Sequence, residues 1–275
     1  MTLRNLSLLC LVSLVGCTDG DPLSEDKHVA GWANSSSALG VFSIGYEPLG
    51  FADGEFHFDD PACPVTSDDG TTVTIHGGCK DSKGTTWAGT ATLVRDGSAR
   101  HITFDSYGND ALLGMEKTTG RFDVTESGTG HAFDVDLRRS GGIETTIRYT
   151  GTVVGDYQGR TVWNGSGHIT RDGITINSGS VDAVTVDAVR DDAVCAGQGA
   201  SGTTKMTSNE HEVVIAYDGA TDCDPDAAAR WMRDGEDMGM IKGISCSTGS
   251  PTGFGLIGVA LVFVLRRRRA STPRS

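Results

Sequence analysis

The chain has 275 residues, with 23 basic and 36 acidic side chains and a formal net charge of −13 at pH 7. This acidic balance argues against nucleic-acid binding, which requires a basic surface, and against electrostatic attraction to anionic lipids. The length is sufficient for one large domain or two small ones.

The N-terminus has the pattern of a secretory signal, because Arg4 precedes a mostly apolar stretch that ends at Val15. The signal closes with the letters LVGC at Cys17, which resemble the lipobox of bacterial lipoprotein signals. The resemblance implies that residues 1–16 are removed and that acyl chains on Cys17 hold the protein at a membrane. Acidic Asp19 is the third mature residue rather than the second, so the outer membrane or cell surface is the expected location.

Three further segments follow the signal. Residues 17–38 are polar and rich in Ser and Gly, which is typical of a flexible tether between a lipid and a domain. We expect the folded body to extend from residue 39 to 246 as one antiparallel β domain. Residues 247–275 then form a C-terminal tail.

The body alternates apolar and polar residues with a period of two, as strands with one buried face do. Thr and Val are abundant and suit a pleated surface, and Gly-containing triplets such as RDG predict turns. The predicted fold class is all-β, with an antiparallel meander that forms a large curved sheet, a sandwich or a barrel. The best helical candidate, Pro225–Met232, can equally lead into a strand. The expected strands lie in TVTIHG, TWAGTATLVRDG, HITFDSYGND, GRFDVTES, HAFDVDLRRSGG, IETTIRYTGTVVG, SVDAVTVDAVRD and HEVVIAYDG.

One pattern, Trp-x-Gly-x₅-Arg-Asp-Gly, occurs twice, beginning at Trp87 and at Trp163, and a shorter trace, WMRDG, begins at Trp231. One interpretation is a duplicated unit of about 75 residues, close to the separation of the first two tryptophans. These tryptophans would then fill equivalent core positions, and Arg95 and Arg171 would cap equivalent turns. The alternative is that strand tryptophans and Asp-Gly turns recur by chance in a β-rich chain.

The chain has seven cysteines, of which Cys10 leaves with the signal and Cys17 is assigned to the lipid. Exported chains meet an oxidising compartment, so disulfides are expected among the other five. Because five is odd, one cysteine has another role. The expected assignment is Cys63–Cys79, Cys195–Cys223 and a separate Cys246 in the tail, and the alternative pairs Cys223 with Cys246.

Calcium is the one metal for which the sequence offers candidates, and no other cofactor is expected. Acidic oxygens at alternating positions in DGATDCDPD could hold a hard cation. The segment departs from an EF-hand loop, since Ala227 occupies the place of the glycine and Arg233 that of the closing glutamate. A disulfide-pinned surface loop is the alternative, and Asp59 with Asp60 forms a second acidic turn. The candidate ligands are Asp218, Asp222, Asp224 and Asp226.

Two arrangements could support catalysis. Asp134 and Asp136 are two residues apart, so they lie on one face of a strand, near Asp123 on a neighbouring strand. Carboxylates grouped in this way occur in glycosidases, and also on any solvent-exposed sheet face. Ser166 and His168 share a strand face without an identifiable acid. The sequence has no phosphate-binding loop, dinucleotide fingerprint or nucleophile elbow. A deep cleft lined by the aspartates and aromatic rings would favour an enzyme, and an open face would favour binding.

The tail has an apolar run, Phe254–Leu265, which as a helix covers about 18 Å of a hydrocarbon core of about 30 Å. Cys246, this run and the arginines that follow resemble the C-terminal sorting tails of the MYXO-CTERM type in myxobacterial surface proteins. The resemblance implies a tail that is held in the membrane and then cut, although its polar spacer is longer than that family's. A retained single-pass anchor is the alternative. The arginines are Arg266, Arg267, Arg268 and Arg269.

The leading hypothesis is therefore a lipid-anchored protein of the cell surface with a binding or structural role. The first alternative is a hydrolase on a β-scaffold that acts on a surface polysaccharide. The second is a periplasm-facing lipoprotein that assists envelope assembly. The expected partners are the membrane, through the lipid, and an unidentified component of the envelope or surface, without nucleic acid.

Overall fold

The computed structural model describes residues 21–110, 115–141, 143–155, 159–173, 178–191, 199–217 and 229–242. Within these ranges, short helices precede a long series of strands. The helical elements are α1 (Asp26–Ser36), α2 (Ala38–Phe42), the 3-10 helix η1 (Ser43–Gly45) and α3 (Tyr46–Ala52). The strands are β1 (Val65–Asp68), β2 (Thr72–His76), β3 (Cys79–Lys80), β4 (Thr86–Asp96), β5 (Ala99–Asn109), β6 (Lys117–Ser127), β7 (Gly130–Ser140), β8 (Glu144–Gly155), β9 (Arg160–Asp172), β10 (Gly179–Asp191), β11 (Gly199–Thr207), β12 (Glu212–Ala216), β13 (Ala229–Arg233) and β14 (Glu236–Ile241).

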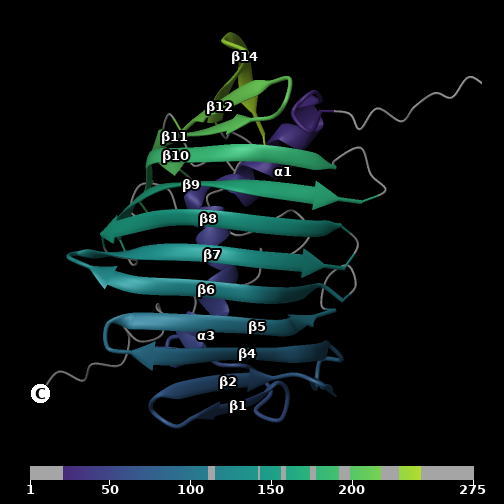
Figure 1. Ribbon diagram of the computed structural model, residues 1–275, viewed down its shortest axis with the longest axis vertical. Coiled ribbons are helices and arrows are strands. Elements are labelled where there is room, and N and C mark those ends of the chain that lie inside the picture. Colours follow the sequence, from purple (N-terminus) through teal and green to yellow (C-terminus); the bar gives the residue numbers. More distant parts are fainter. Residues whose placement is uncertain are drawn as a thin grey trace, which may run out of the picture.

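The described strands form one antiparallel sheet whose order follows the chain from β1, β2 and β4 to β14, with β3 paired to β4 beside this path. Figure 1 shows them stacked from β1 at the bottom to β14 at the top. The two end strands lie far apart, so the sheet is open. The predicted all-β antiparallel meander is confirmed, and of the expected forms the structure shows the single curved sheet. Each of the eight expected segments contains a strand in its described residues.

Alternation along each strand separates a buried face from an exposed one. In β6, Phe122 and Val124 are buried in the core, whereas Arg121 points outwards to solvent. Because successive side chains of a strand point to opposite faces, the period-two pattern of the sequence assigns each residue to one face. The buried faces together line the concave side of the sheet.

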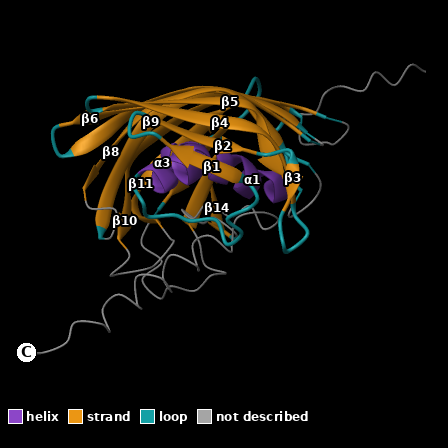
Figure 2. Cartoon of the chain, turned by 90° about the horizontal axis from the view of Figure 1, so that it is seen from below, coloured by secondary structure: helices purple, strands orange, loops and turns teal. Residues whose placement is uncertain are grey.

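The helices occupy the concave side, as Figure 2 shows, where the sheet arches over them. On α1, Val29, Trp32 and Ala33 are buried at the three- and four-residue spacing of a helix face. On α2, the ring of Phe42 lies edge-on to Phe133, with ring centroids 5.3 Å apart. The chain thus fills the arch with its own N-terminal segment.

The tether prediction for residues 17–38 is wrong from Asp21 onwards, and the domain begins before the predicted residue 39. Leu23 and Trp32 are fully buried, and the Ser37 hydroxyl caps α2 by accepting a hydrogen bond from the Gly40 N–H (3.1 Å). Serines suggested a tether, but here they serve as caps and small buried residues around one narrow apolar stripe. The helix that carries this stripe is stable only because the sheet covers its apolar face.

The repeated Arg-Asp-Gly motifs end strands β4, β9 and β13, and each arginine contacts a helix. Arg95 also pairs with Asp68 (2.8 Å), beside the turn between β1 and β2. The tryptophans lie in the core as expected, with Trp163 3% exposed and Trp87 partly buried against the core. The three motifs therefore fasten the helical segment into the arch. Their helix contacts are Arg95 with the Ala52 carbonyl (2.7 Å), Arg171 with the Trp32 ring (4.1 Å to its centroid) and Arg233 with the Asp26 carboxylate (2.9 Å).

Two other predictions concern residues that the structure describes. The Cys63–Cys79 disulfide is present and links the segment before β1 to β3. The helical candidate Pro225–Met232 is wrong from residue 229, because β13 begins there. In the described part of the chain, no helix is both long and apolar enough to cross a membrane.

Candidate functional site

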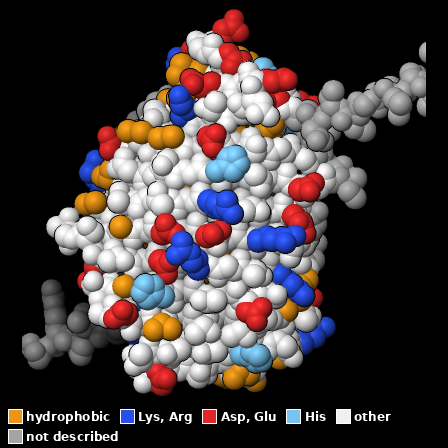
Figure 3. Space-filling view, in the orientation of Figure 1, with side chains coloured by type: hydrophobic (Ala, Val, Ile, Leu, Met, Phe, Trp, Pro, Cys, Tyr) orange, Lys and Arg blue, Asp and Glu red, His pale blue; other side chains and the backbone are white. Residues whose placement is uncertain are grey.

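The exposed convex side of strands β5 to β10 carries a band of charged side chains, called here the convex charged face. Cross-strand pairing aligns its members, since Arg121 lies opposite Asp136, Asp136 opposite Arg148 and Arg148 opposite His168. Figure 3 views this side of the sheet and shows acidic, basic and histidine side chains interspersed over it. The members are His101, Arg121, Asp123, Asp134, Asp136, Arg148, His168 and Asp182.

The three aspartates noted in the sequence do lie together, and arginines engage all of them. Arg121 forms ion pairs with Asp123 and Asp134, each at 3.1 Å, and Arg148 lies 3.6 Å from Asp136. Exposed pairs of this kind contribute little to stability, typically up to about 1 kcal/mol each. These ion pairs therefore matter more for what the face can bind than for the stability of the fold.

The face is open rather than cleft-like. A shallow depression lies over β6 to β9, and Trp163 is on the opposite, helix-covered side of the sheet. A glycosidase holds its two carboxyl groups in a site that encloses the sugar and excludes water, and no such walls surround these aspartates. Because the aspartates lie on an open face and not in a deep cleft, the arrangement favours binding. The polar residues that line the depression are Arg121, Asp134, Asp136, Arg148, Thr150 and Ser166.

The structure supplies an acid for the strand-borne Ser166 and His168 pair, which the sequence could not identify. His168 Nδ1 lies 2.8 Å from Asp182 Oδ1 on β10. Among the described contacts, however, no hydrogen bond joins Ser166 to His168. Ser166 also lies between paired strands, whose backbone N–H groups are used by the sheet and cannot form an oxyanion hole. The three residues therefore lack the geometry of a nucleophilic triad.

Similar histidine–aspartate pairs recur across neighbouring strands. His101 Nδ1 lies 2.8 Å from Asp123, and His211 Nδ1 lies 2.7 Å from Asp234 in the turn between β13 and β14. These pairs cross-link adjacent strands on the exposed side, which is a structural use of such residues.

Metal binding finds no support in the described ranges, which contain no group of three or more potential ligands. Asp60 instead pins a loop, because its carboxylate accepts hydrogen bonds from the N–H groups of Ala62 (2.8 Å) and Ser82 (2.7 Å). These bonds lower the pKa of Asp60. Other predicted residues lie outside the described residues, namely Cys17, Cys195, Cys223, Cys246, Asp218, Asp222, Asp224, Asp226 and Arg266–Arg269.

Sequence reasoning missed one titratable pair beneath the sheet. The Tyr107 hydroxyl of β5 donates a 2.6 Å hydrogen bond to Glu47 Oε1 of α3. Burial raises the pKa of Glu47 from 4.5 to about 7, against the opposing effect of this hydrogen bond. The pair joins residues 60 positions apart, and nothing in the local sequence YEPLGFA marks the half-buried glutamate as one with an enclosed carboxyl group.

Comparison of the chain with protein-family models, curated proteins and solved structures finds no match in any of the three.

Proposed function

We propose that this chain is a lipid-anchored protein of the cell envelope that presents the convex charged face to a polar partner. Its role is binding or structural rather than catalytic. The observation that supports this role best is the placement of Asp123, Asp134 and Asp136 on an open face, each engaged by an arginine. The location rests on the LVGC sequence that ends at Cys17.

The architecture is consistent with a binding scaffold. Helices α1 to α3 fill the concave side with buried apolar side chains, so the ligand-accessible surface of the described sheet is its convex side. Paired charges and hydroxyl groups on that side offer donors and acceptors without a large net charge. Such a surface suits a polar polymer or protein that brings both hydrogen-bond donors and acceptors.

The anchor is tested by the Cys17→Ser variant, which removes the only thiol in the LVGC sequence. We expect the wild-type protein to fractionate with membranes, to carry acyl chains on Cys17, and to be cut by protease added to intact cells. The variant should lack the acyl mass. Cys10→Ser is the matched control and should retain the acyl mass. An unacylated N-terminus in the wild-type protein would refute the anchor.

The binding face is tested by the double variant Arg121→Gln with Arg148→Gln. Loss of two charged donors should weaken binding to isolated envelope fragments by about tenfold or more, since one net charged hydrogen bond contributes about 1.5–3 kcal/mol. Lys83→Gln removes an exposed charge far from the face and is the control. Binding constants come from co-sedimentation at several salt concentrations. Equal binding by both variants would exclude this face as the binding surface.

A further inference from the structure

A shallow groove lies between α1 and the last two strands, at the β14 end of the sheet, where exposed methionines lie among charged side chains. Met238 and Met240 are 38% and 55% exposed there, and Met240 is the most exposed large apolar side chain in the described part of the chain. This groove is called the α1–β14 groove. Its lining residues are Asp26, Lys27, Ala30, Trp231, Met238, Met240, Ile241 and Lys242.

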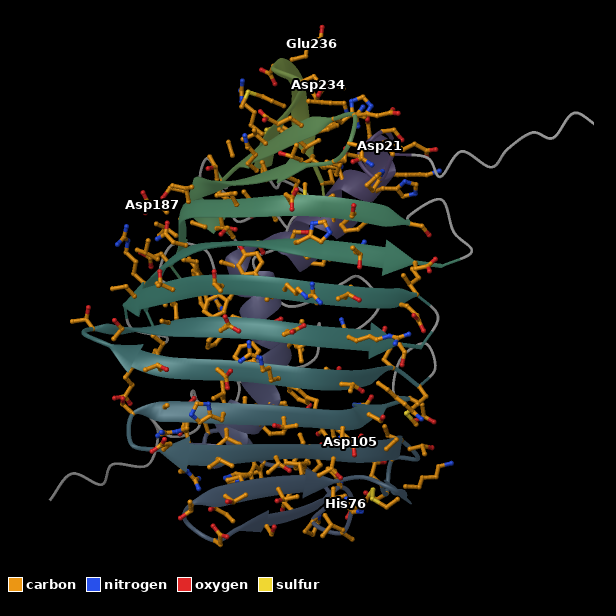
Figure 4. The ribbon with its side chains drawn as sticks, viewed as in Figure 1. Asp21, His76, Asp105, Asp187, Asp234 and Glu236 are labelled. Atoms are coloured by element: carbon orange, nitrogen blue, oxygen red, sulfur yellow. A yellow bond between two sulfur atoms is a disulfide. The ribbon has the colours of Figure 1, made fainter. Side chains whose placement is uncertain are left out.

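The chain enters and leaves the described body at this end. The Asp21 carboxylate accepts hydrogen bonds from the Ser208 hydroxyl (2.7 Å) and the Glu210 N–H (3.1 Å), so the first described residue is fixed to the β11–β12 turn. Figure 4 shows Asp21, Asp234 and Glu236 at the same end of the molecule. Lys242, the last described residue, lines the groove.

The lipid site predicted at Cys17 is only four residues before Asp21. Four residues span at most about 14 Å, because an extended chain covers about 3.5 Å per residue. If Cys17 is acylated, as in the proposed function on which this step rests, the bilayer must lie within that distance of Asp21. The exposed methionines at the same end then lie close to the lipid.

We propose that the α1–β14 groove rests on a phospholipid bilayer, with Met238 and Met240 at the boundary between headgroups and acyl chains. Methionine side chains are unbranched and adaptable, which suits contact with fluid lipid. Lys27 lines the groove, and its exposed side chain, which pairs with Glu25 at 2.8 Å, lies where headgroup phosphates would come. Asp21 and Asp26 lie nearby, so the groove should favour zwitterionic over anionic lipids.

The edge strand argues against another strand as the occupant. Gly239 of β14 has a φ of +81°, and its N–H donates to Asp237 Oδ1 (2.9 Å), which interrupts the regular pairing with β13. Bulges of this kind twist an edge away from pairing with a second sheet. A strand of a second copy therefore cannot pair regularly with β14. A bilayer does not need a regular strand edge.

The first test uses the unmodified acylated protein in phosphatidylcholine vesicles treated with hydrogen peroxide. Exposure alone makes Met240 react faster than the half-buried Met115 before β6. A groove seated on lipid reverses this order, so that Met115 forms its sulfoxide faster than Met238 and Met240. Mass spectrometry of the peptides gives the three rate constants. Faster oxidation of Met240 than of Met115 on vesicles would overturn the proposal.

The second test uses phosphatidylcholine with bromine on its acyl chains, which quenches nearby indole fluorescence. Trp231 lines the groove, whereas Trp163 lies in the middle of the sheet, and both are 3% exposed. We expect quenching in the wild-type protein, its loss in Trp231→Phe and its retention in the matched control Trp163→Phe. Protection from peroxide without quenching would mean that protein covers the groove, which contradicts the proposal.

The acylation of Cys17 and flotation with the vesicles are measured on the same samples. An acylated, floating protein without quenching refutes the lipid-seated groove and leaves the proposed anchor intact. A chain that is neither acylated nor floating refutes both.

Discussion

Substitution of Trp32 by alanine is expected to lower the free energy of unfolding by about 3–5 kcal/mol. The indole is fully buried on the concave side, and the Arg171 guanidinium stacks 4.1 Å from its centroid. Burial lowers the pKa of Arg171 from 12.5 to about 10, so this cation depends on its contacts with α1. Truncation removes both the apolar volume and the stacking partner. Urea unfolding followed by circular dichroism measures the loss.

The control for this prediction is Lys27→Ala on the same helix, whose side chain is 63% exposed. It should change the unfolding free energy by no more than about 0.5 kcal/mol. If Trp32→Ala were as stable as the wild-type protein, the segment from Asp21 to Ala38 would not be part of the cooperative fold. The prediction from the sequence that this segment is a flexible tether would then be correct.

Substitution of Glu47 by glutamine is expected to stabilise the protein at pH 8 and to have little effect at pH 4. The folded-state pKa of Glu47, about 7, lies above its ordinary value of 4.5 because the carboxyl group is buried. Below pH 4.5 the group is protonated in both states and imposes no penalty. As the pH rises towards 7, the unfolded state releases the proton first, so folding stability falls. The full difference is about 3 kcal/mol above the folded-state pKa.

The measurement is the unfolding free energy of wild type and Glu47→Gln between pH 4 and pH 8. The variant should lose the decline in stability that the wild type shows between about pH 4.5 and 7. Exposed Glu55→Gln is the control and should leave the wild-type profile unchanged. Parallel profiles for wild type and Glu47→Gln would show that the Tyr107 contact does not enclose a desolvated carboxyl group.

The strands were predictable because each carries its own signal. In β6 and β8 the alternation of apolar and polar residues is nearly unbroken, and a strand with one buried face requires that period. The meander was also predictable, since apart from the short β3 each strand pairs with its neighbour along the chain. Of the cysteine pairs expected from the sequence, Cys63–Cys79 lies in the described residues and is present.

The helices were not predictable in the same way. Segment α1 reads DKHVAGWANSS, in which a narrow stripe of Val29, Trp32 and Ala33 is surrounded by polar residues. An isolated helix of that length is marginal in water. Only the concave sheet, contributed by residues far along the chain, makes the stripe a buried face.

By itself, the sequence determined the strands, their order and the side of the sheet on which each residue lies, because these depend on local alternation and short connections. Tertiary structure alone decided which residues meet across long separations. It joined Arg233 to Asp26 across 207 positions and brought α1 and β14 together to line one groove. The reason is physical: the curvature of the sheet and the packing of helices within it are collective properties of the whole chain, and no single segment encodes them.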